Sequence, residues 1–296
     1  MGTKKVPFRG VATALVTPFK NGEPDMAAFD RLIDKQLAAG IDALVIFGTT
    51  GEAATLTEHE QEKLLDFALR RIDGRVPVIA GCGANCTEKM IRMSENAQKT
   101  GCDGLLLVTP YYNKATPRGL IASFGAVADR VNLPIILYHV PSRTGLTVPP
   151  AVFAELSRRE NIVGLKEASG SIAYLEDVMA LCGDDLAYYT GNDDLIHATV
   201  ALGGAGAISV LSNLLPAATC MLCRLSREGK HEKAAQLQLF YLPLIRALFS
   251  EVNPIPVKTA LHLMGLCEEE FRLPLCPIEP ENREKLLAEM KKVGIL

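Results

Sequence analysis

The sequence predicts an α/β fold, a (β/α)8 TIM barrel with a C-terminal helical extension. Eight apolar runs with the character of buried strands recur along the chain, and charged segments with helical spacing separate them. After about residue 230 the strand-like runs cease, and the remaining segments have a helical pattern. We therefore expect the barrel, with the active site, to span residues 1–225 and a helical domain to occupy residues 226–296.

The expected strands are rich in Val, Ile and Leu. Most of them are apolar throughout, which is typical of parallel strands that are covered on both faces. A doubly wound open sheet is the alternative, but it would normally carry a GxGxxG turn after the first strand, and none stands there. In order, the expected strands are residues 11–19, 43–48, 77–83, 104–110, 134–140, 162–169, 187–192 and 204–210.

The expected helices have recognisable ends. Residues 26–40 place apolar side chains on one side and end at Gly40, a residue type that commonly terminates helices. Residues 57–74 begin with Thr57, followed three residues later by Glu60, which is the pattern of a capping box. Beyond the barrel, helices are expected at residues 231–250, 255–266 and 281–293.

Composition and charge exclude several classes of function. Among 296 residues, 31 are Lys or Arg and 34 are Asp or Glu, so the net charge of -3 gives no reason to expect a nucleic acid as partner. The uncharged run at residues 198–223 contains three glycines and a proline. We interpret it as buried barrel elements and not as a membrane span.

The cysteines and histidines show no spacing that would hold a metal ion. The one CxxC, from Cys220 to Cys223, lacks a second pair. The first ten residues have no apolar secretory core, so we expect reduced, buried thiols and a cytoplasmic protein.

Lys166 is the residue that most strongly indicates chemistry. In such barrels the active site lies at the carboxyl ends of the strands, and Lys166 lies near the end of an otherwise apolar run. Side chains alternate along a strand, so Ile162, Gly164 and Lys166 share one face. Burial lowers the pKa of an ammonium and yields the neutral amine that a Schiff base requires. The alternative is a lysine that faces outward and keeps its charge in water.

Tyr138 ends the expected strand that precedes the lysine strand. Its phenol can pass a proton to or from intermediates beside the lysine. The alternative is a core or rim tyrosine with a satisfied hydroxyl. The next residue, His139, points to the other face of the strand, and we interpret it as structural.

Three loops carry further candidates. Residues 48–52, GTTGE, offer two hydroxyls and backbone N–H groups to a carboxylate, although an ordinary strand-to-helix turn has the same composition. Arg143 has a planar fork suited to a carboxylate, the alternative being a solvated surface residue. Residues 203–206, GGAG, are a candidate phosphate cradle, but we favour close backbone packing.

Four motifs occur together in one order. They are GTTGE at 48–52, VTPYYN at 108–113, YHVPSRTG at 138–145 and GLKEASG at 164–170. In these motifs the chain resembles the dihydrodipicolinate synthase / N-acetylneuraminate lyase family of Schiff-base-forming barrels, from about Gly10 through the C-terminal helices. Arg143 makes the resemblance closest to the synthases of that family, because lyases acting on sialic acid or sugar acids usually lack it. The resemblance implies condensation of pyruvate with L-aspartate 4-semialdehyde in lysine and diaminopimelate biosynthesis.

The resemblance also implies the parts of the site. Pyruvate would form an imine with the lysine, which itself supplies the electron sink, so no metal or organic cofactor is expected. Tyr112, one of the proton-relay residues, would come from a neighbouring subunit of a homo-oligomer, commonly a tetramer built as a dimer of dimers. The implied catalytic residues are Lys166, Tyr138, Thr49 and Tyr112, and the implied substrate-binding residues are Thr50, Arg143, Gly191 and Ile208.

Feedback inhibition by lysine is expected to be weak or absent. Lysine-sensitive bacterial relatives carry two histidines on the helix after GTTGE, where this chain has Glu58 and Gln61. Lys89 stands where an acidic residue is expected, while Asn85 and Tyr111 remain.

Two other functions stay open at this point. Another pyruvate-dependent aldolase or lyase, acting on a sugar acid, would share Lys166 and Tyr138. A non-catalytic barrel that only binds a ligand would form no covalent adduct with pyruvate.

Overall fold

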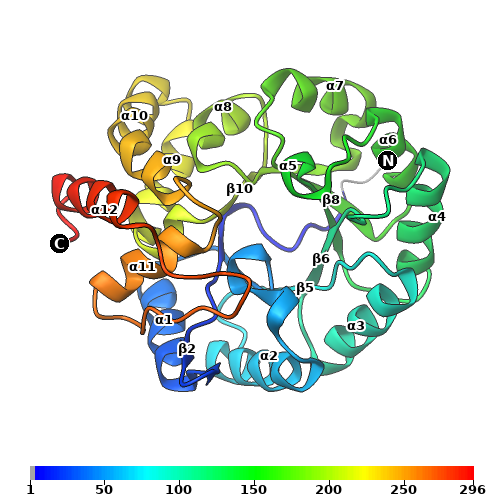
Figure 1. Ribbon diagram of the computed structural model, residues 1–296. Coiled ribbons are helices and arrows are strands. Elements are labelled where there is room, and N and C mark those ends of the chain that lie inside the picture. Colours follow the sequence, from blue (N-terminus) through cyan, green and yellow to red (C-terminus); the bar gives the residue numbers. More distant parts are fainter. Residues whose placement is uncertain (1–3) are drawn as a thin grey trace.

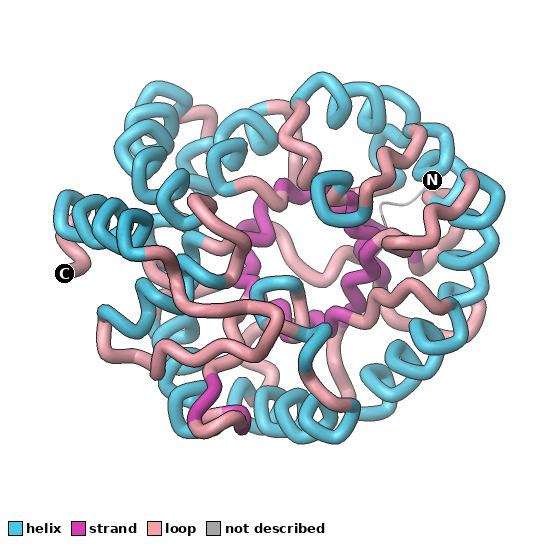
Figure 2. Tube along the Cα trace, viewed as in Figure 1, coloured by secondary structure: helices cyan, strands magenta, loops and turns pink. Residues whose placement is uncertain are grey.

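The computed structural model describes residues 4–296, which form a closed barrel of eight parallel strands with helices around it (Figure 1). Figure 2 shows the strands as a ring at the centre and most of the helices outside it. Neighbouring strands follow the order of the chain, and β1 closes the ring by pairing with β10. The predicted fold class is confirmed. The barrel strands are β1 Gly10–Ala14, β4 Ala43–Ile46, β5 Val78–Gly81, β6 Gly104–Val108, β7 Ile135–His139, β8 Ile162–Glu167, β9 Ala187–Thr190 and β10 Gly206–Ser209, and β2 Phe19–Lys20 and β3 Glu23–Pro24 form a separate hairpin.

The helices cover the outside of the ring. Within residues 4–296, none combines the length and the apolar character needed to cross a bilayer. The α-helices are α1 Met26–Ala38, α2 Glu58–Ile72, α3 Thr87–Thr100, α4 Pro117–Ala128, α5 Pro141–Thr144, α6 Pro150–Leu156, α7 Ile172–Cys182, α8 Ile196–Ala201, α9 Pro216–Arg227, α10 His231–Leu248, α11 Ile255–Leu263 and α12 Pro280–Lys292.

Local signals set the ends of α1 and α2. The Thr57 hydroxyl accepts the Glu60 backbone N–H (3.2 Å), and the Glu60 carboxylate accepts the Thr57 backbone N–H (2.8 Å). This is the predicted capping box. Helix α1 ends at Ala38, and Gly40 follows with φ of 71°, a conformation that favours glycine.

The expected strand at residues 11–19 is wrong in its second half. Strand β1 ends at Ala14, and the following residues leave the barrel to form the β2–β3 hairpin. Pro18 has no N–H to donate to a strand ladder. The Thr17 hydroxyl instead donates to the Gly51 carbonyl (2.7 Å), so this apolar run also supports the loop after β4.

Side chains fill the inside of the barrel below its carboxyl end. Tyr189 on β9 is fully buried, its ring stacks on Phe8 with centroids 4.5 Å apart, and its hydroxyl donates to the Phe8 carbonyl (2.6 Å). Val45, Ile79 and Ile136 belong to the same interior cluster. Because this region is packed, the interior itself holds no ligand, and we expect the active site at the carboxyl ends of the strands.

The C-terminal helices are joined to the loop between β4 and α2. Lys258 on α11 is fully buried, and its Nζ makes an ion pair with Glu52 (2.6 Å) and donates to the Glu270 carbonyl (2.6 Å). In Figure 1, α10, α11 and α12 lie together at one side of the barrel, near α9. The extension therefore supports one of the strand ends where chemistry is expected.

Candidate active site

Lys166 lies inside the barrel near the carboxyl end of β8. It pairs in register with Tyr138 on β7 and with Tyr189 on β9. Only 6% of the residue is exposed, and its Nζ lies 4.2 Å from the centre of the Tyr138 ring. The alternative that Lys166 faces solvent is therefore wrong.

The surroundings of Lys166 favour its neutral amine. Burial lowers the pKa of Lys166 to about 7, and the positive charge of Arg143 acts in the same direction. The negative charge of Asp193 opposes this shift. Near neutral pH a large fraction of the amine is unprotonated and can attack a carbonyl carbon.

Tyr138 is buried beside the amine, with 7% of the residue exposed. Burial raises the pKa of its phenol, whereas the charge of Arg143 and the polar side chain of Thr49 nearby lower it. The tyrosine therefore keeps its proton at neutral pH and has a hydroxyl neighbour with which to exchange it.

The GTTGE loop forms two short 3-10 turns, Thr49–Gly51 and Ala53–Thr55. Between the turns, Glu52 has φ of 52° and is buried against Lys258. Thr50 is 2% exposed, and its Oγ1 accepts a hydrogen bond from Asn253 Nδ2 (2.9 Å). The loop is thus a fixed structure that holds one hydroxyl at the mouth of the barrel.

Arg143 lies on α5, at the rim of the mouth. Its Nη2 donates to the Asn253 carbonyl (3.2 Å). Within the described part of the chain, no carboxylate lies within ion-pair distance of it. The guanidinium therefore keeps donors that can bind a carboxylate.

Gly191, directly after β9, borders the Lys166 side chain, and Ile208 lies on β10 in the barrel interior. A Cβ at Gly191 would lie 2.8 Å from Lys166 Cε and 2.7 Å from Ala168 Cβ, so a side chain there would displace the lysine. Ile208 is fully buried, pairs with Ala12 in register and belongs to the interior cluster.

Tyr112 is the predicted site residue that the single chain does not bring to the others. It is 90% exposed and has φ of 70°, an uncommon conformation for a residue with a Cβ. The loop therefore presents this ring to the outside of the subunit and away from Tyr138.

His139 lies on the outer face of β7, as the alternation of side chains predicts. Its Nδ1 lies 3.2 Å from Glu167 Oε1, its Nε2 accepts the Val148 N–H (3.3 Å), and its ring stacks on Tyr174. These contacts tie β7 to β8, to the loop before α6 and to α7, so His139 has a structural place.

The glycines at residues 203–206 lie at the opposite end of the barrel from Lys166. A Cβ at Gly204 would lie 2.6 Å from the Thr199 carbonyl, and one at Gly206 would lie 1.7 Å from the Gly10 carbonyl. Close backbone packing explains this motif, and a phosphate cradle at the active site does not.

Comparison with known proteins agrees with this geometry. The profile described as the dihydrodipicolinate synthetase family matches residues 7–293. The chain belongs to this family. The 4-hydroxy-tetrahydrodipicolinate synthase of Alkaliphilus oremlandii is 48% identical over 289 residues, which cover 98% of this chain and all of that protein.

Solved structures of dihydrodipicolinate synthases have the same fold. The crystal structure of the enzyme from Thermotoga maritima matches with a TM-score of 0.97 at 43% identity, over 98% of this chain and 100% of that one. A structure described as the first monomeric dihydrodipicolinate synthase variant matches with a TM-score of 0.96 at 44% identity, over 98% of each chain. The family resemblance read from the four motifs is confirmed.

In this member of the dihydrodipicolinate synthetase family, two candidate functional residues, Asp193 and Asn253, were not predicted from the sequence. Asp193 follows β9 and is 1% exposed; its Oδ2 accepts the N–H groups of Val210 (3.0 Å) and Leu211 (2.7 Å), while its Oδ1 has no partner within residues 4–296. Because Asp193 follows an expected strand, the sequence could have indicated it as a site residue. Asn253 comes from the C-terminal extension, for which the sequence held no such signal.

A cavity opens from the mouth of the barrel toward α2 and α3. It reaches from the GTTGE loop to Lys89 and Tyr111, two of the positions considered above for inhibition by lysine. Its lining includes Thr49, Gln61, Lys89, Tyr111, Arg143 and Asn253.

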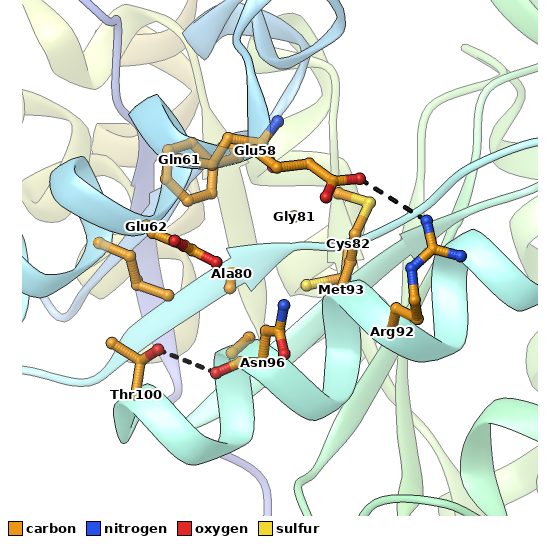
Figure 3. A pocket seen from close by; sticks show the side chains of 13 residues that line it. Glu58, Gln61, Glu62, Ala80, Gly81, Cys82, Arg92, Met93, Asn96 and Thr100 are labelled. Atoms are coloured by element: carbon orange, nitrogen blue, oxygen red, sulfur yellow. Dashed lines mark hydrogen bonds and ion pairs between the residues drawn. The ribbon is translucent and has the colours of Figure 1, made fainter.

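A second, smaller pocket lies between α2 and α3, and Figure 3 shows its side chains. Glu58 points across this pocket to Arg92, with 3.6 Å between the two charged groups. Gln61 borders both pockets. Glu58 is thus engaged away from the barrel mouth.

Metal ligands do not gather anywhere in the described chain. No group of three or more His, Cys, Asp or Glu residues within residues 4–296 is placed to hold an ion. The mouth of the barrel presents an amine, a phenol, hydroxyls and a guanidinium.

Proposed function

We propose that the chain condenses pyruvate with L-aspartate 4-semialdehyde to give 4-hydroxy-tetrahydrodipicolinate, as a lysine-dependent, class I aldolase-type lyase of lysine and diaminopimelate biosynthesis. One observation carries the proposal: Lys166 is buried beside Tyr138 at the carboxyl end of the barrel, with its pKa lowered to about 7. The names of the relatives supply the product, and the family resemblance supplies the two substrates.

The reaction begins with an imine at Lys166. The neutral Nζ attacks the keto carbon of pyruvate, and the resulting carbinolamine loses water after its hydroxyl receives a proton. Removal of a proton from the methyl carbon turns the protonated imine into an enamine. The imine nitrogen takes up the electron pair, so the step needs no metal or organic cofactor.

Carbon–carbon bond formation and release follow. The enamine carbon attacks the aldehyde carbon of the second substrate, whose oxygen becomes a hydroxyl. The amine of that substrate then attacks the imine carbon, the ring closes, and Lys166 leaves as a free amine. One water is released over the whole reaction, and the lysine is regenerated.

Tyr138 and Thr49 move the protons that these steps require. The phenol gives a proton to the carbinolamine hydroxyl and recovers one as the enamine forms. The nearby Thr49 hydroxyl gives the proton a way out of the buried site. We assign Tyr112 to the same relay, acting in the site of a neighbouring subunit, because in its own chain it faces outward.

The remaining residues bind the substrates. Thr50 binds the carboxylate of pyruvate with its hydroxyl, and Arg143 binds the carboxylate of aspartate semialdehyde at the rim. Gly191 leaves space for the lysine tip, and Ile208 lines the pocket floor.

The role given to Tyr112 makes a dimer the smallest complete site. We propose a homotetramer built as a dimer of dimers. The monomeric variant among the structural neighbours shows that the fold of that protein is compatible with a single chain. We also propose a cytoplasmic location, since all eight cysteines are free thiols.

Reductive trapping tests the proposed function. The protein is incubated with pyruvate and borohydride and then weighed by mass spectrometry, with Lys166→Ala as the control. We expect a stable adduct that is lost in the variant, and condensation when aspartate semialdehyde is supplied. An adduct together with turnover of a sugar acid would favour the aldolase alternative, and no adduct at all would favour a barrel that only binds its ligand.

A further inference from the structure

Asn253 connects the C-terminal extension to both carboxylate-binding residues. It lies in the turn between α10 and α11 and is 6% exposed. Its Nδ2 donates to Thr50 Oγ1 (2.9 Å), and its backbone carbonyl accepts from Arg143 Nη2 (3.2 Å). These partners lie 203 and 110 residues away in the chain, so the contacts depend on how the extension packs on the barrel.

The direction of the Thr50 hydrogen bond decides where its proton can go. A hydroxyl has one hydrogen to donate and two lone pairs to accept with. Because Thr50 accepts from the Asn253 amide, its own hydrogen remains unused, and within residues 4–296 it has no acceptor. A carboxylate accepts hydrogen bonds and donates none, so it is the partner that such a hydroxyl can bind.

The other end of the Asn253 amide supports a dedicated role. Its Oδ1 is buried and has no partner in the described chain. A buried polar atom without a partner is costly, and proteins retain such atoms mainly where the side chain serves another purpose. Here the Oδ1 atom of Asn253 stays without a partner, while its Nδ2 atom holds the Thr50 oxygen in a fixed place.

We propose that Asn253 is a positioning residue that donates to Thr50 and thereby turns the Thr50 hydroxyl proton toward the carboxylate of the keto acid. This inference rests on the proposed function, since it takes the carboxylate of pyruvate as the ligand of Thr50. Asn253 itself does not touch the substrate; it acts through Thr50.

Replacing Asn253 by aspartate reverses the hydrogen bond without changing the shape of the side chain. An asparagine amide and an ionised aspartate carboxylate have nearly the same size, and they differ in the donor and in the charge. In N253D the carboxylate therefore accepts a hydrogen bond from the Thr50 hydroxyl and repels the substrate anion. We expect the KM for pyruvate to rise about 10- to 100-fold, with a smaller change in kcat, because a hydrogen bond to a charged group is lost.

A pH series distinguishes positioning from general damage. At low pH the new carboxyl group is protonated, regains a donor and loses its charge. The ratio of the KM of N253D to that of the unchanged protein should therefore fall as pH is lowered. Asn132→Asp, at an exposed asparagine, is the matched control and should leave the KM unaltered at every pH.

Asn253→Ala provides the second variant, because it removes both the donor and the unmatched acceptor. We expect a smaller rise of the KM for pyruvate, since the Thr50 hydroxyl is then free to rotate. If N253D fails to fold, the KM of N253A and its trapped adduct at limiting pyruvate decide the question. An unchanged KM in the folded variants, or an N253D enzyme without pH-dependent recovery, would overturn the proposal. Absence of any adduct in the unchanged protein would instead refute the proposed function itself.

Discussion

Lys166 and Tyr138 are register partners on β8 and β7, and the lysine Nζ lies 4.2 Å from the centre of the tyrosine ring. Parallel pairing brings the two side chains to the same face and the same level of the barrel. The proposed nucleophile and the proposed proton donor are thereby held together by backbone hydrogen bonds and not by flexible loops.

The first prediction concerns the pH dependence of imine formation. Because burial lowers the pKa of Lys166 to about 7, the neutral amine increases as pH rises through this value and then reaches a plateau. Only on the order of one amine in a hundred is neutral at about pH 5. The initial rate of borohydride-trapped adduct with pyruvate measures this, and Lys166→Ala should give none at any pH. A rate that keeps rising to about pH 10 would indicate an ordinary lysine.

The second prediction separates the two substrates at Arg143. Arg143→Ala should lower kcat/KM for aspartate semialdehyde about 10- to 100-fold, since a charge-assisted hydrogen bond to its carboxylate is lost. The adduct with pyruvate alone should form nearly as before. Unchanged kinetics with both substrates would show that Arg143 does not bind aspartate semialdehyde. Arg70→Ala, at an exposed arginine on α2, is the control and should alter neither measurement.

The third prediction concerns the glycine that faces the lysine. In Gly191→Ala the new Cβ would lie 2.8 Å from Lys166 Cε, so the amine must move. We expect the rate of adduct formation to fall about 10- to 100-fold, because small displacements of a reacting group are costly. In Gly119→Ala the Cβ would meet its nearest neighbours at 3.5 Å, and the rate should stay the same. Equal rates in the two variants would show that the Gly191 position is not crowded.

The fourth prediction concerns inhibition by lysine. Lys89 lines the same cavity as Tyr111, and its ammonium would repel the ammonium of a lysine ligand. Millimolar lysine should therefore leave turnover nearly unchanged. Lys89→Glu reverses the local charge and should increase sensitivity to lysine. Strong inhibition of the unchanged protein would contradict this expectation.

Much of the barrel and its centre could be predicted because their signals are local. Continuous apolar runs mark strands that are covered on both faces, and one lysine in such a run stands out. The break after Ala14 was missed because a chain that leaves the barrel can stay apolar when other segments cover it. The boundary at residue 225 and the roles of the site residues stay predictions.

Contacts with the extension could not be predicted in the same way. Asn253 and Lys258 act on residues 50 and 52, about two hundred positions earlier in the chain. No period or spacing reports a contact over that distance. It follows from how α10 and α11 pack, which only the folded structure shows.

The last prediction tests that link through the buried ion pair of Glu52 and Lys258, whose side chains are 1% and 0% exposed. Glu52→Gln would leave the Lys258 ammonium buried without its charge partner, which should lower the free energy of unfolding by about 3–5 kcal/mol. Asp66→Asn breaks the exposed pair with Arg70 and should cost only about 0–1 kcal/mol. Urea unfolding of both variants measures the difference.

The pH dependence of this loss gives an independent check. Burial already lowers the pKa of Lys258, and removing the Glu52 charge lowers it further. A base whose pKa is lower in the folded state destabilises the fold while it is charged, and the penalty disappears as pH rises toward its unfolded pKa. The loss in Glu52→Gln should therefore shrink at alkaline pH. A small, pH-independent loss, equal to that of Asp66→Asn, would mean that the extension is held by its other contacts and not by this ion pair.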